Sequence, residues 1–379
     1  MGRQVNARVV VAGLGNAATN LHLPALALIE GARVVGGCDP SDARRSEAST
    51  RFGIPVFVTL EEALRTSTPD VVIVCTPPET HLALCMQAFA AGAHVICEKP
   101  IAASVEESNR ILEAAAAADR RIAVNHEFRE MPAYRAVLDA VATDPGGVVF
   151  AQAWQLMNLP PWAEPGWRGH LVRGTLYEAG IHLVDYLMAI FGEKPVAVSA
   201  TMSTCGVRDF DSDAVALVTM EFSRGRLGQV VQHRLCAGET RYFEVRADTP
   251  STSYRVSYGG RVRLSAGLLR STTPHLRLEL GSTGIAWREE GESRRRLAKN
   301  PRNAPMVATR ILLEKTLASF ADGSAPPASG VDGRDAVEVI AACYHAASSG
   351  RRVALAQAAG TPGLSSLSMA VPAATGAAH

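Results

Sequence analysis

Lys99 stands out among the residues that could do chemistry because it follows an apolar run directly. Residues 93–97 (Ala-His-Val-Ile-Cys) are predicted to form a short buried strand, and Glu98-Lys99-Pro100 comes next. In an open parallel α/β sheet, ligands bind in the crevice beyond the carboxyl ends of the strands. Lys99 is therefore expected to direct its ammonium group at a bound ligand. The same tripeptide recurs at residues 193–195, where the context predicts a surface loop.

Two further titratable side chains share one face of a predicted helix. Glu178 and His182 are four residues apart in the segment 178–185 and are therefore neighbours on the helix surface. The carboxylate can orient the imidazole or act beside it as a second polar group. A single histidine on such a helix is more often a hydrogen-bonded core residue. No metal site is predicted, because no further His or Cys is placed to complete a ligand shell.

A glycine-rich turn, Gly13-x-Gly15-x-x-Ala18, follows the first predicted strand and opens a helix. The first glycine permits a tight turn, the second lets the backbone approach a pyrophosphate, and a small residue at position 18 permits close helix–strand packing. The helix N-terminus offers N–H groups to the phosphates. Asp39 ends the second predicted strand about 20 residues later, where an acid accepts hydrogen bonds from ribose hydroxyls. The pattern predicts a dinucleotide site.

The same region bears on the choice of dinucleotide. A carboxylate at position 39 favours NAD, because it would repel the 2′-phosphate of NADP. Arg44 and Arg45 keep NADP possible, since a basic residue just after this strand can accommodate that phosphate. The simpler interpretation of both arginines is an exposed helix face. Residues 76–81 (Thr-Pro-Pro-Glu-Thr-His) follow another apolar strand and are predicted either to pass over the cofactor or to begin a helix.

The elements that must position these residues alternate between strand and helix in the first third of the chain. Helices are predicted at 80–91 and, from a capping box at Ser104, to about residue 118. Strands that are apolar throughout and joined by helices imply a parallel sheet covered on both faces. We predict an α/β, doubly wound Rossmann domain over residues 1–126. Its strands are expected at 8–12, 33–38, 71–75, 93–97 and 122–125.

After about residue 127 the pattern changes to longer strands with alternating apolar and polar residues. The segments 214–222 and 226–234 are joined by a turn at Ser223-Arg224-Gly225, and 241–246 and 254–258 continue the pattern. We predict an α+β domain over residues 127–357 with a large, mostly antiparallel open sheet. Residues 358–379 are rich in Ala, Gly, Pro and Ser and are predicted to be disordered.

Composition narrows the range of partners. The net charge of the 379 residues is +1, which supplies no broad field for nucleic acid or an anionic membrane. No apolar stretch reaches the roughly 20 residues that span a bilayer, and the N-terminus lacks the pattern of a signal peptide. Seven cysteines without metal-type spacing favour a reducing cytoplasm. The open sheet would expose a large face, which predicts a homodimer or homotetramer.

Taken in order, these motifs resemble those of the Gfo/Idh/MocA oxidoreductases, a family of sugar and cyclitol dehydrogenases and related enzymes. The resemblance extends over about residues 7 to 355, and its specificity comes from the order and spacing of the motifs together. The matching segments are Gly13-x-Gly15-x-x-Ala18, His22-Leu23-Pro24-Ala25-Leu26, Asp39, Thr76-Pro77-x-x-x-His81, Glu98-Lys99-Pro100, Val124-x-x-x-x-Arg129-x-x-Pro132, Gly180-x-His182-x-x-Asp185 and Gly330-Val331-Asp332-Gly333-Arg334-Asp335-Ala336.

The resemblance implies roles for particular residues. Lys99 and His182 would carry the proton chemistry, and Glu178 would complete the catalytic set at a position where the family usually has aspartate. The extra methylene displaces the carboxylate by about one C–C bond length, a scale on which catalytic rates respond. The implied cofactor-binding residues are Gly13, Gly15, Asn16, Ala17, Asp39, Thr76, Pro77, His81, Glu98, Lys99 and Asn125. The implied substrate-binding residues are Lys99, Arg129, Trp167, Arg168 and His182.

The hypothesis that follows is reversible hydride transfer between a nicotinamide and a carbinol carbon of a polyhydroxylated substrate. His182, oriented by Glu178, is the first choice for the base that takes the hydroxyl proton, and Lys99 would stabilise the developing alkoxide. The reverse assignment, with Lys99 as the base, stays open. Two alternatives are a glycoside hydrolase or lyase that retains NAD and a non-catalytic dinucleotide sensor. The sensor predicts loss of the lysine or the histidine, and both are present.

Overall fold

The computed structural model describes residues 6–159, 174–206, 213–237, 242–259, 262–267, 275–280 and 284–355. The chain divides into two units. Within the described residues, the first contains the residues up to Glu130 together with those from Pro305 to Ala341, and the second contains the residues from Met131 to Ala304 together with those from Ala342 to Leu355.

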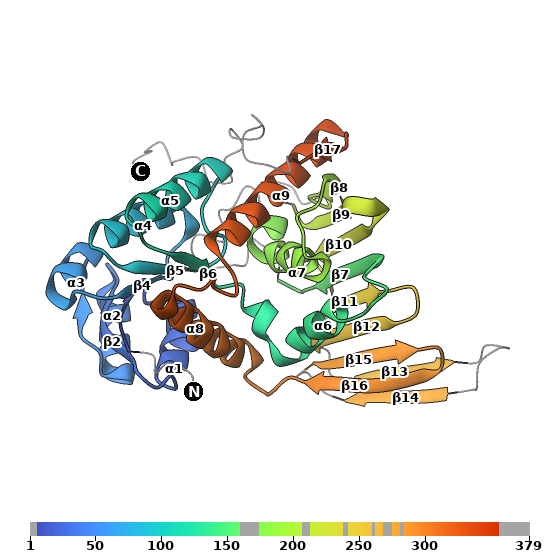
Figure 1. Ribbon diagram of the computed structural model, residues 1–379, viewed down its shortest axis with the longest axis horizontal. Helices are drawn as coiled ribbons and strands as arrows, with labels where there is room; N and C mark the ends of the chain where they lie inside the picture. The colour runs from blue at the N-terminus through green and yellow to red at the C-terminus, as the bar shows by residue number, and fades with distance from the viewer. Residues whose placement is uncertain are drawn as a thin grey trace. The chain divides into compact units, whose positions relative to one another are not determined.

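The first unit is built on a parallel sheet of six strands in the order β3-β2-β1-β4-β5-β6 (Figure 1). The order reverses between β1 and β4, and in open α/β sheets such a switch point is where ligands bind. The predicted doubly wound sheet is confirmed, and β3 is a strand that the sequence did not indicate. The strands are β1 (Ala7–Ala12), β2 (Ala32–Cys38), β3 (Val56–Phe57), β4 (Val71–Val74), β5 (His94–Cys97) and β6 (Ile122–Val124).

Helices cover both faces of this sheet, with α4 and α5 on one side and α8 on the other (Figure 1). The predicted capping box begins α5: Ser104 Oγ accepts the N–H of Glu107 at 3.1 Å, and Glu107 Oε2 accepts the N–H of Ala103 at 3.1 Å. The helices are α1 (Leu23–Leu26), α2 (Asp42–Phe52), α3 (Leu60–Ser67), α4 (His81–Ala90), α5 (Val105–Ala117), α8 (Ala304–Asp322) and the first part of α9 (Gly330–Ser349).

The chain returns to the first unit at α8 and at the start of α9. Leu313 of α8 belongs to the same buried core as Val11 and Ile73 of the sheet. A Cβ added to Gly333 of α9 would lie 2.5 Å from Val124 of β6, so the helix packs closely on that strand. This return differs from the linear division expected at residue 126. The segments carry apolar residues, but no local signal says which sheet they cover.

The second unit is built on a sheet of nine described strands in the order β16-β15-β12-β11-β7-β10-β9-β8-β17. All neighbouring pairs are antiparallel except β7 and β10, which are parallel. The predicted mostly antiparallel sheet is therefore confirmed. Its strands are β7 (Phe150–Leu156), β8 (Ala197–Ser203), β9 (Val215–Glu221), β10 (Leu227–His233), β11 (Tyr242–Asp248), β12 (Ser253–Gly259), β15 (Ile285–Glu290), β16 (Ser293–Lys299) and β17 (Val353–Ala354), and β13 (Val262–Gly267) pairs separately with β14 (His275–Leu280).

Two helices, α6 (Pro132–Ala142) and α7 (Ile181–Phe191), cover one face of the nine-stranded sheet (Figure 1). Burial alternates along the strands accordingly. In β9, Ala216 and Val218 are buried, whereas Leu217 on the opposite face is 46% exposed. One face therefore forms the core of this unit and the other is open, as the alternating sequence predicts.

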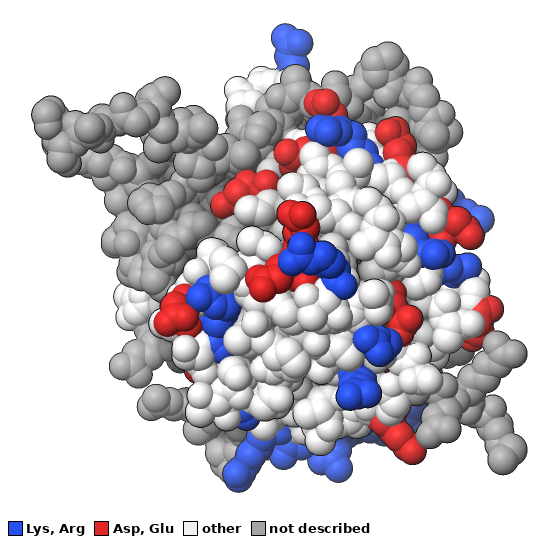
Figure 2. All heavy atoms as spheres, turned by 90° about the vertical axis from the view of Figure 1, so that its left-hand side faces the viewer, with Lys and Arg blue, Asp and Glu red and all other residues white. Residues whose placement is uncertain are grey.

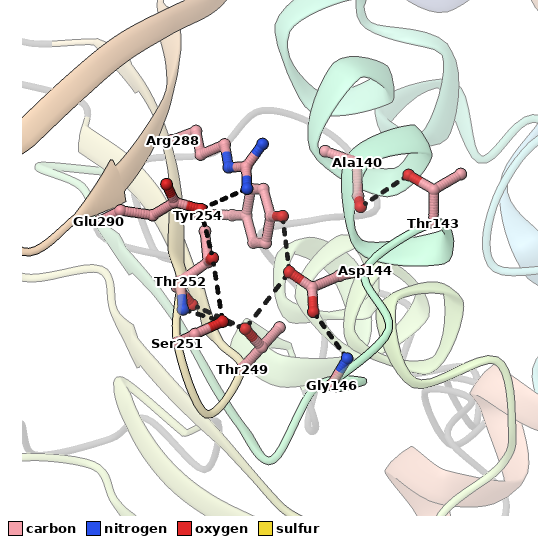
Figure 3. Close-up of polar contacts among 10 residues, drawn as sticks. All are labelled: Ala140, Thr143, Asp144, Gly146, Thr249, Ser251, Thr252, Tyr254, Arg288 and Glu290. Atoms are coloured by element: carbon pink, nitrogen blue, oxygen red, sulfur yellow. Dashed lines mark hydrogen bonds and ion pairs between the residues drawn. The ribbon is translucent and has the colours of Figure 1, made fainter.

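Polar contacts of Asp144 tie the loop after α6 to the turn between β11 and β12 (Figure 3). Its carboxylate accepts the hydroxyls of Tyr254 at 2.8 Å and Thr249 at 3.3 Å. The hydroxyl of Thr252 in the same turn donates to Glu290 at 3.0 Å. These groups satisfy one another at the end of the sheet where β7 begins. Their role is to brace the fold.

Charged side chains of both signs are interspersed on the face shown in Figure 2, among many uncharged residues. Along α2, Arg51 lies 4.0 Å from Glu47, and both side chains are about half exposed. Such exposed pairs contribute little to stability. Within the described residues, no helix combines the length and the apolar character that crossing a bilayer requires.

Candidate active site

The glycine-rich loop after β1 has the close packing that its sequence predicts. The N–H of Gly13 donates to Cys38 O of β2 at 2.8 Å. A Cβ at Gly13 would lie 2.7 Å from Thr76 and 2.8 Å from the carbonyl oxygen of Cys75, and its φ is +87°, so a larger residue does not fit. At Gly15 an added Cβ would meet only one guanidinium nitrogen of Arg44, at 4.0 Å. The backbone there is open to the approach of a ligand.

Asp39 lies at the carboxyl end of β2 and holds this loop. Its carboxylate accepts the N–H of Leu14 at 2.9 Å and the N–H of Ser41 at 2.9 Å. Arg44 lies 3.5 Å from it with a side chain that is 58% exposed. Arg45 instead donates to the carbonyl oxygens of Asp39 and Pro40, at 2.8 and 2.9 Å. Of the two arginines, Arg44 is therefore the one exposed beside the glycine loop.

Beside Lys99, the carboxylate of Glu98 forms a buried hydrogen-bond network. His22 Nε2 lies 2.6 Å from Oε1, Asn125 Nδ2 donates to Oε1 at 2.8 Å, and the N–H of Lys99 lies 3.3 Å from Oε2. Burial opposes ionisation, but the bond from His22, the charge of Lys99 and the bond from Asn125 outweigh it and lower the pKa of Glu98 to about 2. Glu98 is thus an anion at neutral pH. Because an ionised carboxylate only accepts, Nε2 of His22 carries a proton.

His81 braces the loop after β4 against the segment after β5. Its ring is fully buried, with Nε2 at 2.8 Å from Thr76 O and Nδ1 at 3.0 Å from Pro100 O. Burial lowers the pKa of His81, although the carbonyl contacts oppose the shift. The sequence implied cofactor binding for His81. Both ring nitrogens thus contact backbone carbonyl oxygens of the protein, and one of these belongs to Pro100, next to Lys99.

The residues of the first unit fit a bound dinucleotide. Gly13, Asp39, Thr76, Lys99 and Asn125 follow the ends of β1, β2, β4, β5 and β6, so the parallel sheet gathers them at its carboxyl edge. Asn125 Oδ1 is buried and has no hydrogen-bond partner within the described residues. This unmet acceptor matches an N–H donor such as the carboxamide of a nicotinamide. Of the other residues predicted to bind cofactor, Asn16 is exposed, and Ala17 and Pro77 are half-buried.

In the second unit, Asp213 anchors the helical stretch that carries Glu178 and His182. This stretch consists of a π-helical turn, η6 (Thr175–Gly180), followed directly by α7. The buried carboxylate of Asp213 accepts the N–H groups of Gly174, Thr175 and Leu176 at 3.0, 3.1 and 2.8 Å. The hydroxyl of Tyr344 donates to it at 2.9 Å. A negative charge is favourable at a helix N-terminus, because the N–H groups there lack partners within the helix.

Glu178 forms an ion pair with Arg234, which follows β10. Arg234 Nη1 lies 3.7 Å from Glu178 Oε2, and the arginine side chain is 1% exposed. Arg234 Nε donates to Leu159 O at 3.1 Å. His182 is 9% exposed. The half-buried acid and the buried imidazole therefore lie on one helical stretch, which a π-type turn opens, as is frequent at functional sites.

Of the other predicted substrate-binding residues, Arg129 holds the start of α9. Its guanidinium lies 3.2 Å from Asp332 and 3.3 Å from Pro327 O, and its side chain is 11% exposed. Burial opposes ionisation of Asp332, but the charge of Arg129 and the bonds from Ser329 lower its pKa. Trp167 and Arg168 lie outside the described residues. Among the described residues, no group of three or more His, Cys, Asp or Glu side chains could hold a metal ion.

Sequence reasoning missed Asp213, Arg234 and the role of His22. Asp213 and Arg234 act on residues more than 30 positions away, so no local spacing reveals them. The sequence did contain one signal. Gln232 and Arg234 are two and four residues after Val230, so in a strand their side chains are expected on the same, inward face as that apolar residue. A polar residue at an inward position calls for a partner in the core.

Replacing Glu98 tests the buried network. Because the pKa of Glu98 falls from 4.5 to about 2 on folding, its ionised form stabilises the fold fully above about pH 4.5, and this contribution is lost as the pH falls toward 2. We expect Glu98→Gln to lower the free energy of unfolding at pH 7 by about 2 to 3 kcal/mol and to flatten its pH dependence between about pH 5 and 3. Urea unfolding across this range measures both. Glu106→Gln, on the exposed side of α5, is the control, and equal slopes for Glu98→Gln and wild type would contradict the assignment.

Replacing Asp213 tests the helix anchor. We expect Asp213→Ala to lower the free energy of unfolding by about 2 to 4 kcal/mol, because three buried N–H groups lose their acceptor. Hydrogen exchange at the amides of residues 174–176 should accelerate more than exchange elsewhere in the second unit. Asp144→Ala is the matched control, since it also removes a bonded carboxylate but at the other end of the sheet. Unchanged exchange at residues 174–176 would refute the anchoring role.

Comparison with known proteins agrees with this fold. Residues 7–126 match the NAD-binding Rossmann-fold domain of the oxidoreductase family GFO_IDH_MocA, and residues 136–251 match the GFO/IDH/MocA C-terminal domain. The chain is 32% identical over 189 residues to 1,5-anhydro-D-fructose reductase of Ensifer adhaerens, covering 47% of this chain and 56% of that one. It is 26% identical over 345 residues to D-apiose dehydrogenase of Paraburkholderia graminis, covering 88% and 86%.

The fold is also that of a solved oxidoreductase. The crystal structure of an oxidoreductase from Agrobacterium radiobacter in complex with NAD⁺, L-tartaric acid and magnesium superposes with a TM-score of 0.78 at 17% identity, over 92% of this chain and 98% of that one. At this identity the likeness establishes the fold. The two family domains occur in order and together account for more than half of the 379 residues. The protein therefore belongs to the Gfo/Idh/MocA family of oxidoreductases, and its N-terminal part is an NAD-binding Rossmann domain.

Proposed function

We propose that this protein is an NAD-dependent oxidoreductase that interconverts a hydroxyl and a keto group on a sugar, a cyclitol or a sugar derivative. The observation that carries the proposal is the position of Lys99. It is half-buried at the carboxyl edge of an NAD-binding sheet and directly follows the ionised Glu98. A cation held beside the cofactor site is suited to a substrate oxygen that becomes an alkoxide. The named relatives, a reductase and a dehydrogenase of sugar-type compounds, support the substrate class.

When bound, the cofactor supplies the acceptor or donor of the hydride. The residues that would hold it are those at the carboxyl edge, with the backbone near Gly13 and Gly15 for the phosphates, Asp39 for the ribose and Asn125 for the carboxamide. NAD is the cofactor we propose, on the strength of Asp39 and the family domain. The exposed guanidinium of Arg44 beside the glycine loop leaves NADP as a second cofactor to assay.

His182 is the residue we propose as the general base. Its ring is buried on the helical stretch anchored by Asp213, and proton transfer requires such a fixed position. Glu178 four residues earlier is held by Arg234, so its carboxylate has a defined direction. Lys99 would bind the substrate oxygen and remain the donor of a hydrogen bond to it. Lys99 and His182 thus divide the proton chemistry between them.

The first test removes these two side chains in turn. We expect Lys99→Ala and His182→Ala each to lower turnover about 10²- to 10⁴-fold, because each loses a group that acts on the substrate oxygen or its proton. The assay is NADH absorbance with a panel of sugars, inositols and nucleotide sugars that includes 1,5-anhydro-D-fructose and D-apiose, run with both NAD and NADP. Lys194→Ala, in the second Glu-Lys-Pro tripeptide, is the matched control and should keep wild-type turnover.

The outcome separates the alternatives. Undiminished turnover in both variants would remove Lys99 and His182 from the mechanism. Cleavage of a glycoside without net accumulation of NADH would point to the hydrolase or lyase that retains NAD. Binding of NADH with no turnover of any panel member would favour a dinucleotide sensor.

We also propose that the chain forms a homodimer or homotetramer through the open face of its nine-stranded sheet. Leu217 of β9 and Leu227 of β10 are 46% and 43% exposed on this face, and Val231 lies opposite Leu217 in the antiparallel register. Exposed apolar side chains on adjoining strands are typical of a subunit interface. The seven cysteines, all free, suit a reducing compartment, and the cytoplasm is the location we propose.

Sedimentation equilibrium at micromolar concentration tests the assembly. We expect the mass of two or four chains for the wild type and a shift toward the monomer for Leu217→Glu, because a buried charge at the interface is costly. Leu28→Glu, a comparably exposed position on the first unit, should leave the mass unchanged. A wild-type monomer under these conditions would refute the proposal.

A further inference from the structure

Two pairs of glutamines span the same two strands of the second unit in the same way. Gln152 of β7 lies opposite Gln229 of β10, and Gln155 lies opposite Gln232, in one parallel register. Within each strand the two glutamines are three residues apart. Because successive side chains of a strand alternate between faces, the two pairs lie on opposite faces of the sheet. The two pairs therefore have the same chemistry and the same register but lie on different faces, so each can be compared with the other.

The two glutamines on the open face form a hydrogen bond with each other. Gln152 Nε2 donates to Gln229 Oε1 at 2.6 Å, and both residues are half-buried. This bond shows that the spacing of β7 and β10 permits opposed glutamines to bond directly to each other.

The pair on the helix-covered face is not satisfied in this way. Gln232 is fully buried, and neither its Oε1 nor its Nε2 has a hydrogen-bond partner within the described residues. Gln155 is 8% exposed, and its Oε1 likewise has none there. A buried primary amide left without partners is costly, because it gives up its hydrogen bonds to water. The amide of Gln232 is therefore placed to meet a group that the protein itself does not supply.

The surroundings indicate what kind of group that is. Along the inner side of β10, apolar Val230 is followed by Gln232 and then by Arg234, which pairs with Glu178. The turn η6 packs on β10, and α7, which carries His182, packs on β7. The inner face thus changes from apolar to polar toward the helix start that holds the proposed base.

We propose that Gln155 and Gln232 form a recognition site for one hydroxyl group of the polyhydroxylated substrate, next to the hydroxyl that reacts. A hydroxyl both donates and accepts, so it can bond the amide oxygen and the amide N–H groups together. This inference rests on the proposed function and extends it by naming residues that select the substrate. A trapped water offers the same chemistry, and the experiment distinguishes the two occupants.

The test compares Gln232→Met with Gln229→Met. Methionine keeps the approximate length of the side chain and removes both amide atoms, and Gln229 is the matched control on the opposite face of the same strand. The probes are D-glucose, D-xylose and myo-inositol with their monodeoxy analogues, measured with saturating NAD. We expect Gln232→Met to lower kcat/KM for a hydroxylated probe about 10- to 100-fold, mainly through KM, and Gln229→Met to change it less than about twofold.

The deoxy analogues identify the bonded hydroxyl. In the wild type, one analogue should lose kcat/KM about 10- to 100-fold relative to its parent, and in Gln232→Met this ratio should approach one, because the two changes remove the same bond. If Gln232→Met lowers kcat/KM by the same factor for the parent compound and for every deoxy analogue, the amide bonds no substrate hydroxyl and the proposal is overturned.

A readout without substrate separates this proposal from the proposed function. Thermal unfolding of the ligand-free protein should give Gln232→Met a transition at or above that of wild type, because without ligand the unpartnered amide contributes no bond and its removal relieves the cost of burying it. A fall of several degrees would reveal a trapped water or another structural bond and would overturn the proposal. If the wild type turns over none of the probes, the proposed function fails for these compounds. Calorimetric binding of the same probes then decides the role of the amide pair, and equal affinities for wild type and Gln232→Met overturn the proposal.

Discussion

The burial of an ionised carboxylate is the constraint on which the first unit depends. Glu98 can stay charged in the core only because His22, Asn125 and the backbone of Lys99 direct N–H groups at it. These donors come from the turn after the glycine loop, from the end of β6 and from the end of β5. The network therefore ties together strand ends at the carboxyl edge of the sheet, where we propose that NAD binds, and it fixes the backbone from which Lys99 extends. The position of Lys99 is a consequence of where the charge of Glu98 can be satisfied.

In the second unit, a buried charge with fixed partners likewise positions a helical stretch. Asp213 supplies the acceptor for the first N–H groups of the stretch that carries Glu178 and His182. Arg234 supplies the charge that pairs with Glu178. In each unit, therefore, the side chains proposed for chemistry stand next to a buried charge that has its own fixed partners. Such partners limit the rotation of the functional groups, and precise orientation is what proton transfer and charge stabilisation require.

Polar side chains in the second unit have different surroundings at the two ends of the sheet. Its inner face is apolar where it packs under the helices, as at Val230, and polar where Gln232 and Arg234 approach the turn η6. At the opposite end, Asp144 and the hydroxyls around it satisfy one another and brace the fold (Figure 3). Polar groups that satisfy each other within the protein maintain structure, whereas a buried amide left unmet is suited to a ligand.

Much of this protein was determined by its sequence alone. Apolar runs with short connections predict the parallel sheet, strict alternation predicts the open one, and Gly13 with Asp39 predicts the dinucleotide site, because these depend on neighbours along the chain. The sequence also placed Lys99 at a strand end, since a strand and its last residue are local features. The tertiary structure alone decided that α8 and the start of α9 return to the first sheet, that His22 bonds Glu98, and that Asp213 and Arg234 hold the helix of Glu178. These pairings join residues far apart in sequence, and only the folded register of strands and helices brings their charges within hydrogen-bond or ion-pair reach.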